Sequence, residues 1–246
     1  MYVETSGPAD APAILLIHGG GVAGWMWRAQ VEVLARDYRV IVPDLPGHGR
    51  SASEPYTTQQ EVAEALAAVL EDEGVTDVAV VGFSLGGQLA VQLASSRSDL
   101  VSRVVVVSCL IEPIPFARFS TWMLGVAAPL ARSERFARAQ AKQLFIPAEL
   151  LDDYVATSVS MSKGDLLALS RANFSFRMPA AWADFPGRAL IIAGTREPRA
   201  VRASMAALHA ALPGSELELV EGAGHGISLQ RPEWFTELLR RWLAAG

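Results

Sequence analysis

Ser84 is the residue of this chain best suited to nucleophilic chemistry. It stands between Gly82 and Gly86, directly after an apolar run of strand type and directly before a helical pattern. Glycines at these two positions remove the β-carbons that would clash in a sharp strand-to-helix turn, and such a turn pushes the serine hydroxyl out at the edge of a sheet. A serine attacks a carbonyl carbon only when a base lies within hydrogen-bond reach.

Four histidines are candidates for that base: His18, His48, His209 and His225. His225 follows the last alternating strand-like run, 216–220, within the sequence Gly-Ala-Gly-His-Gly. Small residues there predict a loop that reaches the carboxyl edge of the sheet, where Ser84 is expected. His209 lies within a helical pattern and is expected at the surface. We therefore interpret His225 as the general base.

A third segment could supply electrophilic stabilisation. The apolar run 14–17 leads into His18 and three consecutive glycines, 19–21. Without side chains in the way, a backbone N–H of such a loop can approach a reacting carbonyl. The run 41–43 likewise ends in a tight turn that contains Pro46-Gly47-His48-Gly49.

These motifs, in this order along nearly the whole chain, resemble the α/β-hydrolase superfamily. The resemblance implies that Ser84 is the nucleophile and that the chain order nucleophile, acid, histidine ends at His225. Phe83 and Leu85 around the serine also occur in the bacterial haloperoxidase-like esterases. Haloalkane dehalogenases and epoxide hydrolases of the superfamily carry aspartate at the position of the nucleophile, so Ser84 argues against both activities.

The resemblance leaves two candidates for the acid that orients the histidine. After the next-to-last strand the family pattern is Gly-x-x-Asp, and here Gly194-Thr-Arg-Glu197 puts a glutamate at the aspartate position. The alternative is Glu112, just past the strand-like run 103–108, where some members carry their acid. We favour Glu197 from its place in the motif order.

For the oxyanion hole, the resemblance implies the N–H of the residue after the nucleophile, Leu85, and a second N–H from the loop after His-Gly. That second donor is Gly20, with Gly21 as the alternative because the triple glycine blurs the register. In the family, the positions of His18 and His48 have structural roles.

Strands that alternate with amphipathic helices predict an α/β fold. Most of the strand-like runs are continuously apolar, as in a mainly parallel sheet with helices on both faces. Between 111 and 182 no strand is expected, and short helices rich in large apolar side chains predict a helical cap. The expected division is a core of 1–110 and 183–246 with a cap of 111–182. The strand-like runs are 2–5, 14–18, 40–43, 78–82, 103–108, 189–193 and 216–220.

Composition excludes several classes of protein. The net charge of −5 disfavours nucleic acid as a partner, and the single cysteine, Cys109, allows no internal disulfide. We find no cofactor fingerprint and no metal-ligand spacing, and no apolar run approaches the ~20 residues of a membrane span. Nothing resembles a secretory signal, so we expect a cytoplasmic protein. Alanine- and arginine-rich usage suggests a bacterial gene. A homo-oligomer is left open.

Together these features predict a serine hydrolase that cleaves a small to medium apolar carboxylic ester, or a related acyl compound, through an acyl-enzyme on Ser84. Thioesters, lactones and carbon–carbon bonds of diketones suit the same apparatus. Two alternatives stay open. One is a slow or non-catalytic ligand-binding module on this fold. The other is a carbon–carbon hydrolase or a lyase that uses the same triad, and for the lyase Lys142 and Lys163 are candidate cations.

Overall fold

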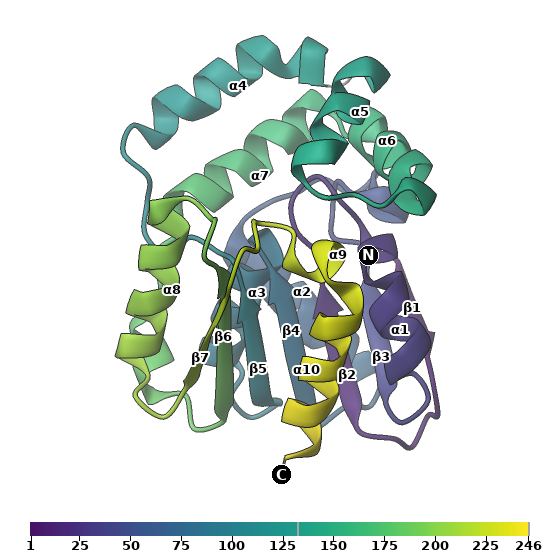
Figure 1. The fold of residues 1–246 in the computed structure, drawn as a ribbon, viewed down its shortest axis with the longest axis vertical. Coiled ribbons are helices and arrows are strands. Elements are labelled where there is room, and N and C mark those ends of the chain that lie inside the picture. The colour runs from purple at the N-terminus through teal and green to yellow at the C-terminus, as the bar shows by residue number, and fades with distance from the viewer. Residues whose placement is uncertain (132, 246) are drawn as a thin grey trace.

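One sheet organises the computed structural model, which describes residues 1–131 and 133–245. Seven strands form it within the described residues, in the order β1-β3-β2-β4-β5-β6-β7 (Figure 1). Only β1 runs antiparallel to its neighbour β3, and the other paired strands are parallel. The strands are β1 (Val3–Ser6), β2 (Ala13–Ile17), β3 (Arg39–Pro43), β4 (Val78–Phe83), β5 (Val101–Val107), β6 (Arg188–Gly194) and β7 (Glu216–Val220).

The mainly parallel sheet with helices on both faces is confirmed. No strand begins or ends more than two residues from its predicted limit. In β4, Val78 and Val80 belong to one buried cluster, while Ala79 and Val81 belong to the other. Alternate side chains therefore enter two cores, which explains why the strand has no polar face.

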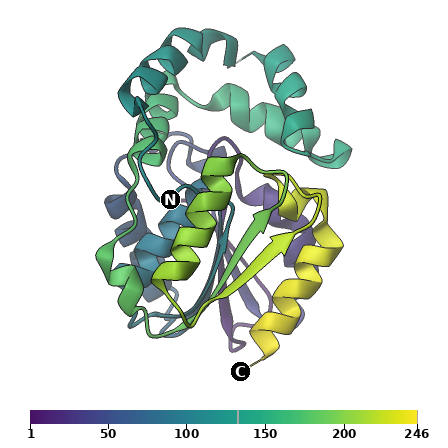
Figure 2. The same cartoon turned by 60° about the vertical axis from the view of Figure 1, so that its left-hand side comes forward.

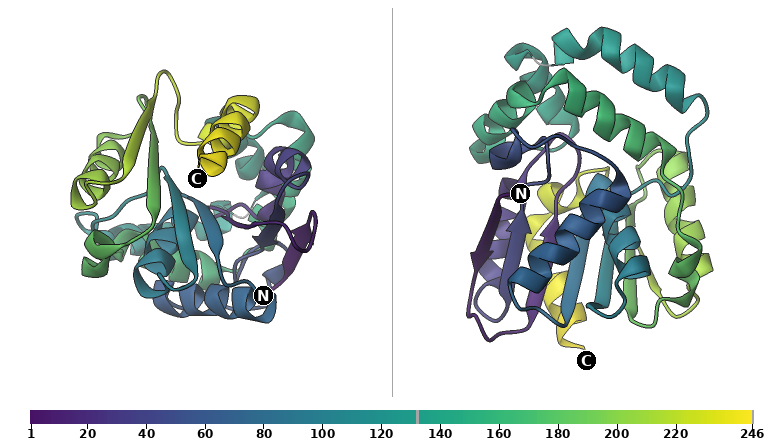
Figure 3. Two further views of the ribbon diagram at one scale, coloured as in Figure 1. Left: turned by 90° about the horizontal axis from the view of Figure 1, so that it is seen from below. Right: turned by 180° about the vertical axis from the view of Figure 1, so that it is seen from behind.

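Helices cover each face of the sheet. One core contains residues of α2 (Gln59–Asp72), α3 (Leu85–Ser96) and α8 (Arg199–Ala211), and the other contains residues of α1 (Arg28–Leu34) and α10 (Pro232–Ala244). Figure 3 shows these helices on opposite sides of the strands. Local sequence fixes their ends, since the Thr58 hydroxyl accepts from the Glu61 N–H at 3.1 Å and Pro232 opens α10.

The connection from β5 to β6 is built from helices. They are α4 (Ala117–Ala131), α5 (Glu134–Gln143), α6 (Leu151–Ser160) and α7 (Lys163–Ser175), with short 3-10 turns at Ala148–Leu150 and Ala180–Asp184. We call α4 to α7 the helical layer, and it lies over the carboxyl edge of the strands (Figures 1 and 2). The limits 111–182 for a cap domain stay a prediction, and residue 132 of that range lies outside the described residues. Among the described helices, none has the length and apolar character to cross a membrane.

Polar contacts join the helical layer to the core. Asp165 of α7 accepts a hydrogen bond from the Tyr56 N–H at 2.9 Å, and its side chain is buried. The indole N–H of Trp25 donates to the Thr157 hydroxyl of α6 at 3.0 Å. These contacts hold the layer above the strand ends, where the predicted site residues lie.

Candidate functional site

Ser84 occupies a single-residue turn between β4 and α3. Its backbone has φ 54° and ψ −113°, a conformation that costs a non-glycine residue about 1–3 kcal/mol. A β-carbon on Gly82 would lie 2.1 Å from the carbonyl oxygen of Gly86, and one on Gly86 would lie 2.3 Å from that of Ile17. Both glycines are therefore required by close backbone approach, as the spacing predicts.

His225 is brought to Ser84 by the loop after β7. Its Nε2 lies 3.2 Å from the Ser84 Oγ, within hydrogen-bond distance. The loop is tightly covered by the helical layer, because a β-carbon on Gly224 would lie 2.8 Å from the Phe145 ring and one on Gly226 would lie 2.5 Å from the Leu144 carbonyl oxygen. The small residues around His225 thus allow the loop to pass beneath the end of α5.

Glu197 lies on the other side of the His225 ring, in the loop between β6 and α8. Its Oε1 is 3.6 Å from the His225 Nδ1, beyond ordinary hydrogen-bond length, and its side chain is fully buried. Neither carboxylate oxygen has a hydrogen-bond partner among the described residues. Burial, with the nearby Glu197 charge, also raises the pKa of the Cys109 thiol. The His225 imidazole is the one ion-pair partner found for the Glu197 carboxylate in the described chain.

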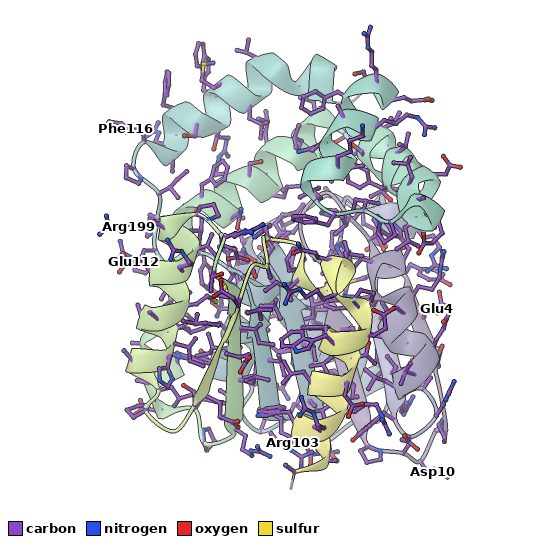
Figure 4. The ribbon with its side chains drawn as sticks, viewed as in Figure 1. Glu4, Asp10, Arg103, Glu112, Phe116 and Arg199 are labelled. Atoms are coloured by element: carbon purple, nitrogen blue, oxygen red, sulfur yellow. The ribbon has the colours of Figure 1, made fainter. Side chains whose placement is uncertain are left out.

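Glu112, the alternative acid, is not brought to the histidine. Its side chain is exposed, and within residues 1–131 and 133–245 no hydrogen bond or ion pair joins it to His225. Figure 4 shows it beside the start of α8, at the outer edge of the molecule.

The two backbone groups expected at an oxyanion hole lie beside Ser84. Leu85 is the first residue of α3, and the first N–H groups of a helix have no partner within it. Gly20 lies next to it, since a β-carbon on Gly20 would be 3.8 Å from the Leu85 Cδ2. Gly21, with φ 78°, lines the same cavity. The structure therefore brings both loop glycines and the helix start together around the serine.

Three of the four ring nitrogens of His18 and His48 lie at hydrogen-bond distance from backbone groups. The His18 Nδ1 lies 2.7 Å from the Gly19 carbonyl oxygen, and its Nε2 accepts from the Leu45 N–H at 2.8 Å. The His48 Nδ1 lies 2.8 Å from the Pro46 carbonyl oxygen. Burial lowers the pKa of both imidazoles, that of His18 to about 3. Both are therefore neutral residues that fix the two loops, while His209 is bonded to Ser215 near the far end of α8.

A cavity of about 410 Å³ opens on Ser84 beneath the helical layer. Its wall is largely apolar and is supplied by all four helices of the layer. The apolar side chains are Leu85, Leu124, Phe136, Leu144, Met161, Leu166, Leu169 and Phe174. In addition to Ser84, the polar lining residues are Gln140, Tyr154, Ser158 and Asn173. Larger cavities of about 450, 580 and 880 Å³ lie elsewhere and are not lined by Ser84.

Comparison with known proteins identifies the family. A model of the alpha/beta hydrolase family matches residues 14–238. The chain belongs to the alpha/beta hydrolase family. It is a hydrolase of that family, and the resemblance seen in the motifs is confirmed.

Three proteins illustrate what this hydrolase is similar to. It is 30% identical over 258 residues to "Putative carbamate hydrolase RutD" of Escherichia coli, a match that covers 96% of this chain and 88% of that protein. It is 42% identical over 113 residues to the magnesium-chelatase 30 kDa subunit of Rhodobacter capsulatus, covering 45% of this chain and 39% of that one. An esterase from Exiguobacterium antarcticum superposes with a TM-score of 0.87 at 22% identity, covering 99% and 95% of the two chains, which shows the shared fold.

The motifs did not reveal the polar residues of this hydrolase's cavity wall. Gln140 and Tyr154 face the cavity from α5 and α6, yet neither belongs to a motif. The spacing of Gln140 and Tyr154 within their helices does not indicate whether they face solvent, the core or the cavity. Among the described residues, no group of three or more histidine, cysteine, aspartate or glutamate side chains is placed to hold a metal ion.

Proposed function

We propose that this protein is a serine hydrolase that cleaves small to medium apolar carboxylic esters, or related acyl compounds, through an acyl-enzyme on Ser84. The observation that carries the proposal is the 3.2 Å contact between the His225 Nε2 and the Ser84 Oγ at an apolar cavity. A neutral imidazole at this distance can accept the hydroxyl proton as the oxygen attacks. The cavity, of about 410 Å³, suits the apolar part of such a substrate.

The proposed reaction has two halves. The Ser84 Oγ forms a bond to the acyl carbon while its proton passes to the His225 Nε2, and the carbonyl oxygen becomes an oxyanion that the Leu85 and Gly20 N–H groups bind. Collapse breaks the bond to the alcohol oxygen, which takes the proton from His225. Water then attacks the acyl carbon and gives a proton to His225. Collapse breaks the bond between that carbon and the Ser84 Oγ, which takes the proton from His225, and the acid is released.

Glu197 acts in this proposal by stabilising the imidazolium that forms during each half-reaction. A buried carboxylate without hydrogen bonds is costly, and a positive ring beside it relieves that cost. The 3.6 Å separation would close when the ring gains its proton, because the attraction between the two groups then becomes that of an ion pair. The helical layer is proposed to be a cap that excludes water and binds the apolar substituent.

The test is hydrolysis of p-nitrophenyl esters from acetate to decanoate by the wild type and by Ser84→Ala. We expect turnover with the wild type, a loss of about 10³-fold or more in kcat with Ser84→Ala, and covalent labelling of the wild type alone by a fluorophosphonate. Folded wild-type protein that neither turns over an ester nor labels would support the ligand-binding module instead.

Carbamates are a second candidate substrate class, favoured by the similarity to RutD over 96% of this chain. Attack on a carbamate carbonyl needs the same nucleophile, base and oxyanion donors. A p-nitrophenyl carbamate assayed beside the ester of matched size distinguishes the two: faster turnover of the carbamate would move the proposal to that class.

A further inference from the structure

Two residues of the helical layer form a hydrogen-bonded pair in the wall of the cavity at Ser84. The Tyr154 hydroxyl of α6 donates to the Gln140 Oε1 of α5 at 2.9 Å. Tyr154 is held firmly, since only 2% of it is exposed and its ring packs edge-on against Trp25 with centroids 6.3 Å apart. Burial also raises the pKa of Tyr154 to about 12, so its hydroxyl keeps the proton that it donates.

This contact fixes which end of the Gln140 amide is free. The amide oxygen accepts the hydrogen bond from Tyr154, so the NH₂ group at the other end of the amide points away from that hydroxyl. No hydrogen bond from the NH₂ group is found in the described part of the chain. Gln140 lines the same cavity as Ser84, and so do Phe136 and Leu144, one helical turn before and after it. An oriented donor therefore stands between two apolar side chains on a wall that contains the nucleophile.

The lining of the cavity also restricts the charge of its ligand. The cavity has no charged side chain among its described lining residues. A neutral oxygen would pair with the free NH₂ group, whereas a carboxylate would be buried without a counter-charge. A hydroxyl oxygen could also accept from this NH₂ group, but its own proton would then have to share the Gln140 oxygen with the Tyr154 hydroxyl or find another acceptor, whereas a carbonyl brings no donor.

We propose that Gln140, oriented by Tyr154, is a subsite for a neutral acceptor oxygen of the substrate, remote from the carbonyl that Ser84 attacks. The preferred substrates are then apolar esters that carry a second carbonyl, such as oxoacyl esters or esters of ketoalcohols. This inference rests on the proposed ester hydrolysis and narrows its substrate class.

The experiment compares matched pairs that differ by one carbonyl. On the acyl side, p-nitrophenyl 4-oxo- and 5-oxohexanoate are compared with p-nitrophenyl hexanoate. On the alcohol side, the acetates of 4-hydroxy-2-butanone and 5-hydroxy-2-pentanone are compared with butyl and pentyl acetate. We expect at least one oxo compound to exceed its partner in kcat/KM by about 5- to 10-fold in the wild type, as one hydrogen bond provides.

Variants assign the preference to the amide. Gln140→Leu should abolish it while still hydrolysing p-nitrophenyl hexanoate, because it removes the N–H donors and leaves the nucleophile intact. Tyr154→Phe should weaken it by releasing the amide. Asn173→Leu is the matched control, since it removes another neutral amide of the same cavity and should preserve the preference. A preference that survives Gln140→Leu, or that disappears with Asn173→Leu alone, would overturn the proposal.

A binding measurement separates this proposal from the catalytic one. Ser84→Ala protein should turn over the esters at least about 10³-fold more slowly, so the quenching of its tryptophan fluorescence gives their dissociation constants. We expect the same oxo preference in Kd. Preference in binding without turnover by the wild type would refute ester hydrolysis and retain the subsite. Turnover with no oxo preference in any pair would refute the subsite and retain hydrolysis.

Discussion

At the scale of single residues, Glu197 is the unusual member of the site, because the family pattern has aspartate at its position. The structure places its Oε1 3.6 Å from the His225 Nδ1, with the carboxylate wholly buried. The longer side chain therefore already spans most of the distance from its loop to the ring. A shorter acid on the same backbone would end about 1.5 Å further from the imidazole, one carbon–carbon bond length.

We predict that Glu197→Asp and Glu197→Gln both lower kcat/KM on p-nitrophenyl esters. The glutamine removes the charge that stabilises the imidazolium, and a loss of about 10²- to 10⁴-fold is expected from comparable triads. The aspartate keeps the charge but widens the gap, so a smaller loss is expected. Steady-state kinetics with folded protein measures both.

Glu112→Gln is the matched control for these variants, since Glu112 is exposed and makes no contact with His225 in the described chain. It should retain wild-type kcat/KM. If Glu112→Gln lost activity while Glu197→Gln retained it, the assignment of the acid would pass to Glu112.

At the scale of elements, the helical layer is attached to the core through a few polar contacts of different burial. Asp165, near the start of α7, accepts from the Tyr56 N–H, and it also bonds the Ser162 hydroxyl that caps its own helix. On α6, Asp153 pairs with Arg28 at 2.8 Å, but both side chains are more than two-fifths exposed. Buried hydrogen bonds contribute more than solvated ion pairs, so these two links should differ in strength.

We predict that Asp165→Ala destabilises the protein by about 1–3 kcal/mol and makes the helical layer more sensitive to protease, because it leaves the buried Tyr56 N–H unpaired and removes the acceptor of the Ser162 hydroxyl. Urea unfolding and limited proteolysis measure the two effects. Asp153→Ala is the comparison variant and should cost no more than about 1 kcal/mol. Equal effects of the two substitutions would show that Asp165 does not anchor the layer.

The sequence was sufficient to predict the strands and the turn at Ser84, because hydrophobic runs and glycine positions are local signals. It could not predict the contact of Asp165 with Tyr56, which lie 109 residues apart. The same holds for Gln140 and Tyr154, whose meeting depends on how α5 packs on α6. The motif order also indicated Glu197. Its distance from the imidazole could not be predicted, because it depends on the conformations of two loops, and hydrophobic periodicity carries no information on loop conformation.

At the scale of the whole molecule, the loops of the site are built into the core through buried histidines. The rings of His18 and His48 meet edge to face with centroids 5.0 Å apart, between the loop that contains Gly20 and the turn after β3. Both are fully buried, and the Nε2 of His48 has no hydrogen-bond partner among the described residues. Because the two imidazoles hold this loop from within the core, a change that destabilises them should destabilise both the candidate oxyanion loop and the fold.

The stability of the protein should consequently fall in mild acid. Burial is the first cause that lowers the pKa of both rings, that of His18 to about 3, whereas an unfolded chain protonates histidine near pH 6.5. Below pH 6.5 the unfolded state therefore binds more protons, and the free energy of unfolding decreases by up to about 1.4 kcal/mol per pH unit for each histidine that stays neutral. Urea unfolding at pH 7.5, 6.5 and 5.5 measures this slope above the range where carboxylates titrate. Imidazole NMR signals of His18 or His48 that titrate near pH 6.5 in the folded protein would contradict it, since protonation would then cost the fold nothing.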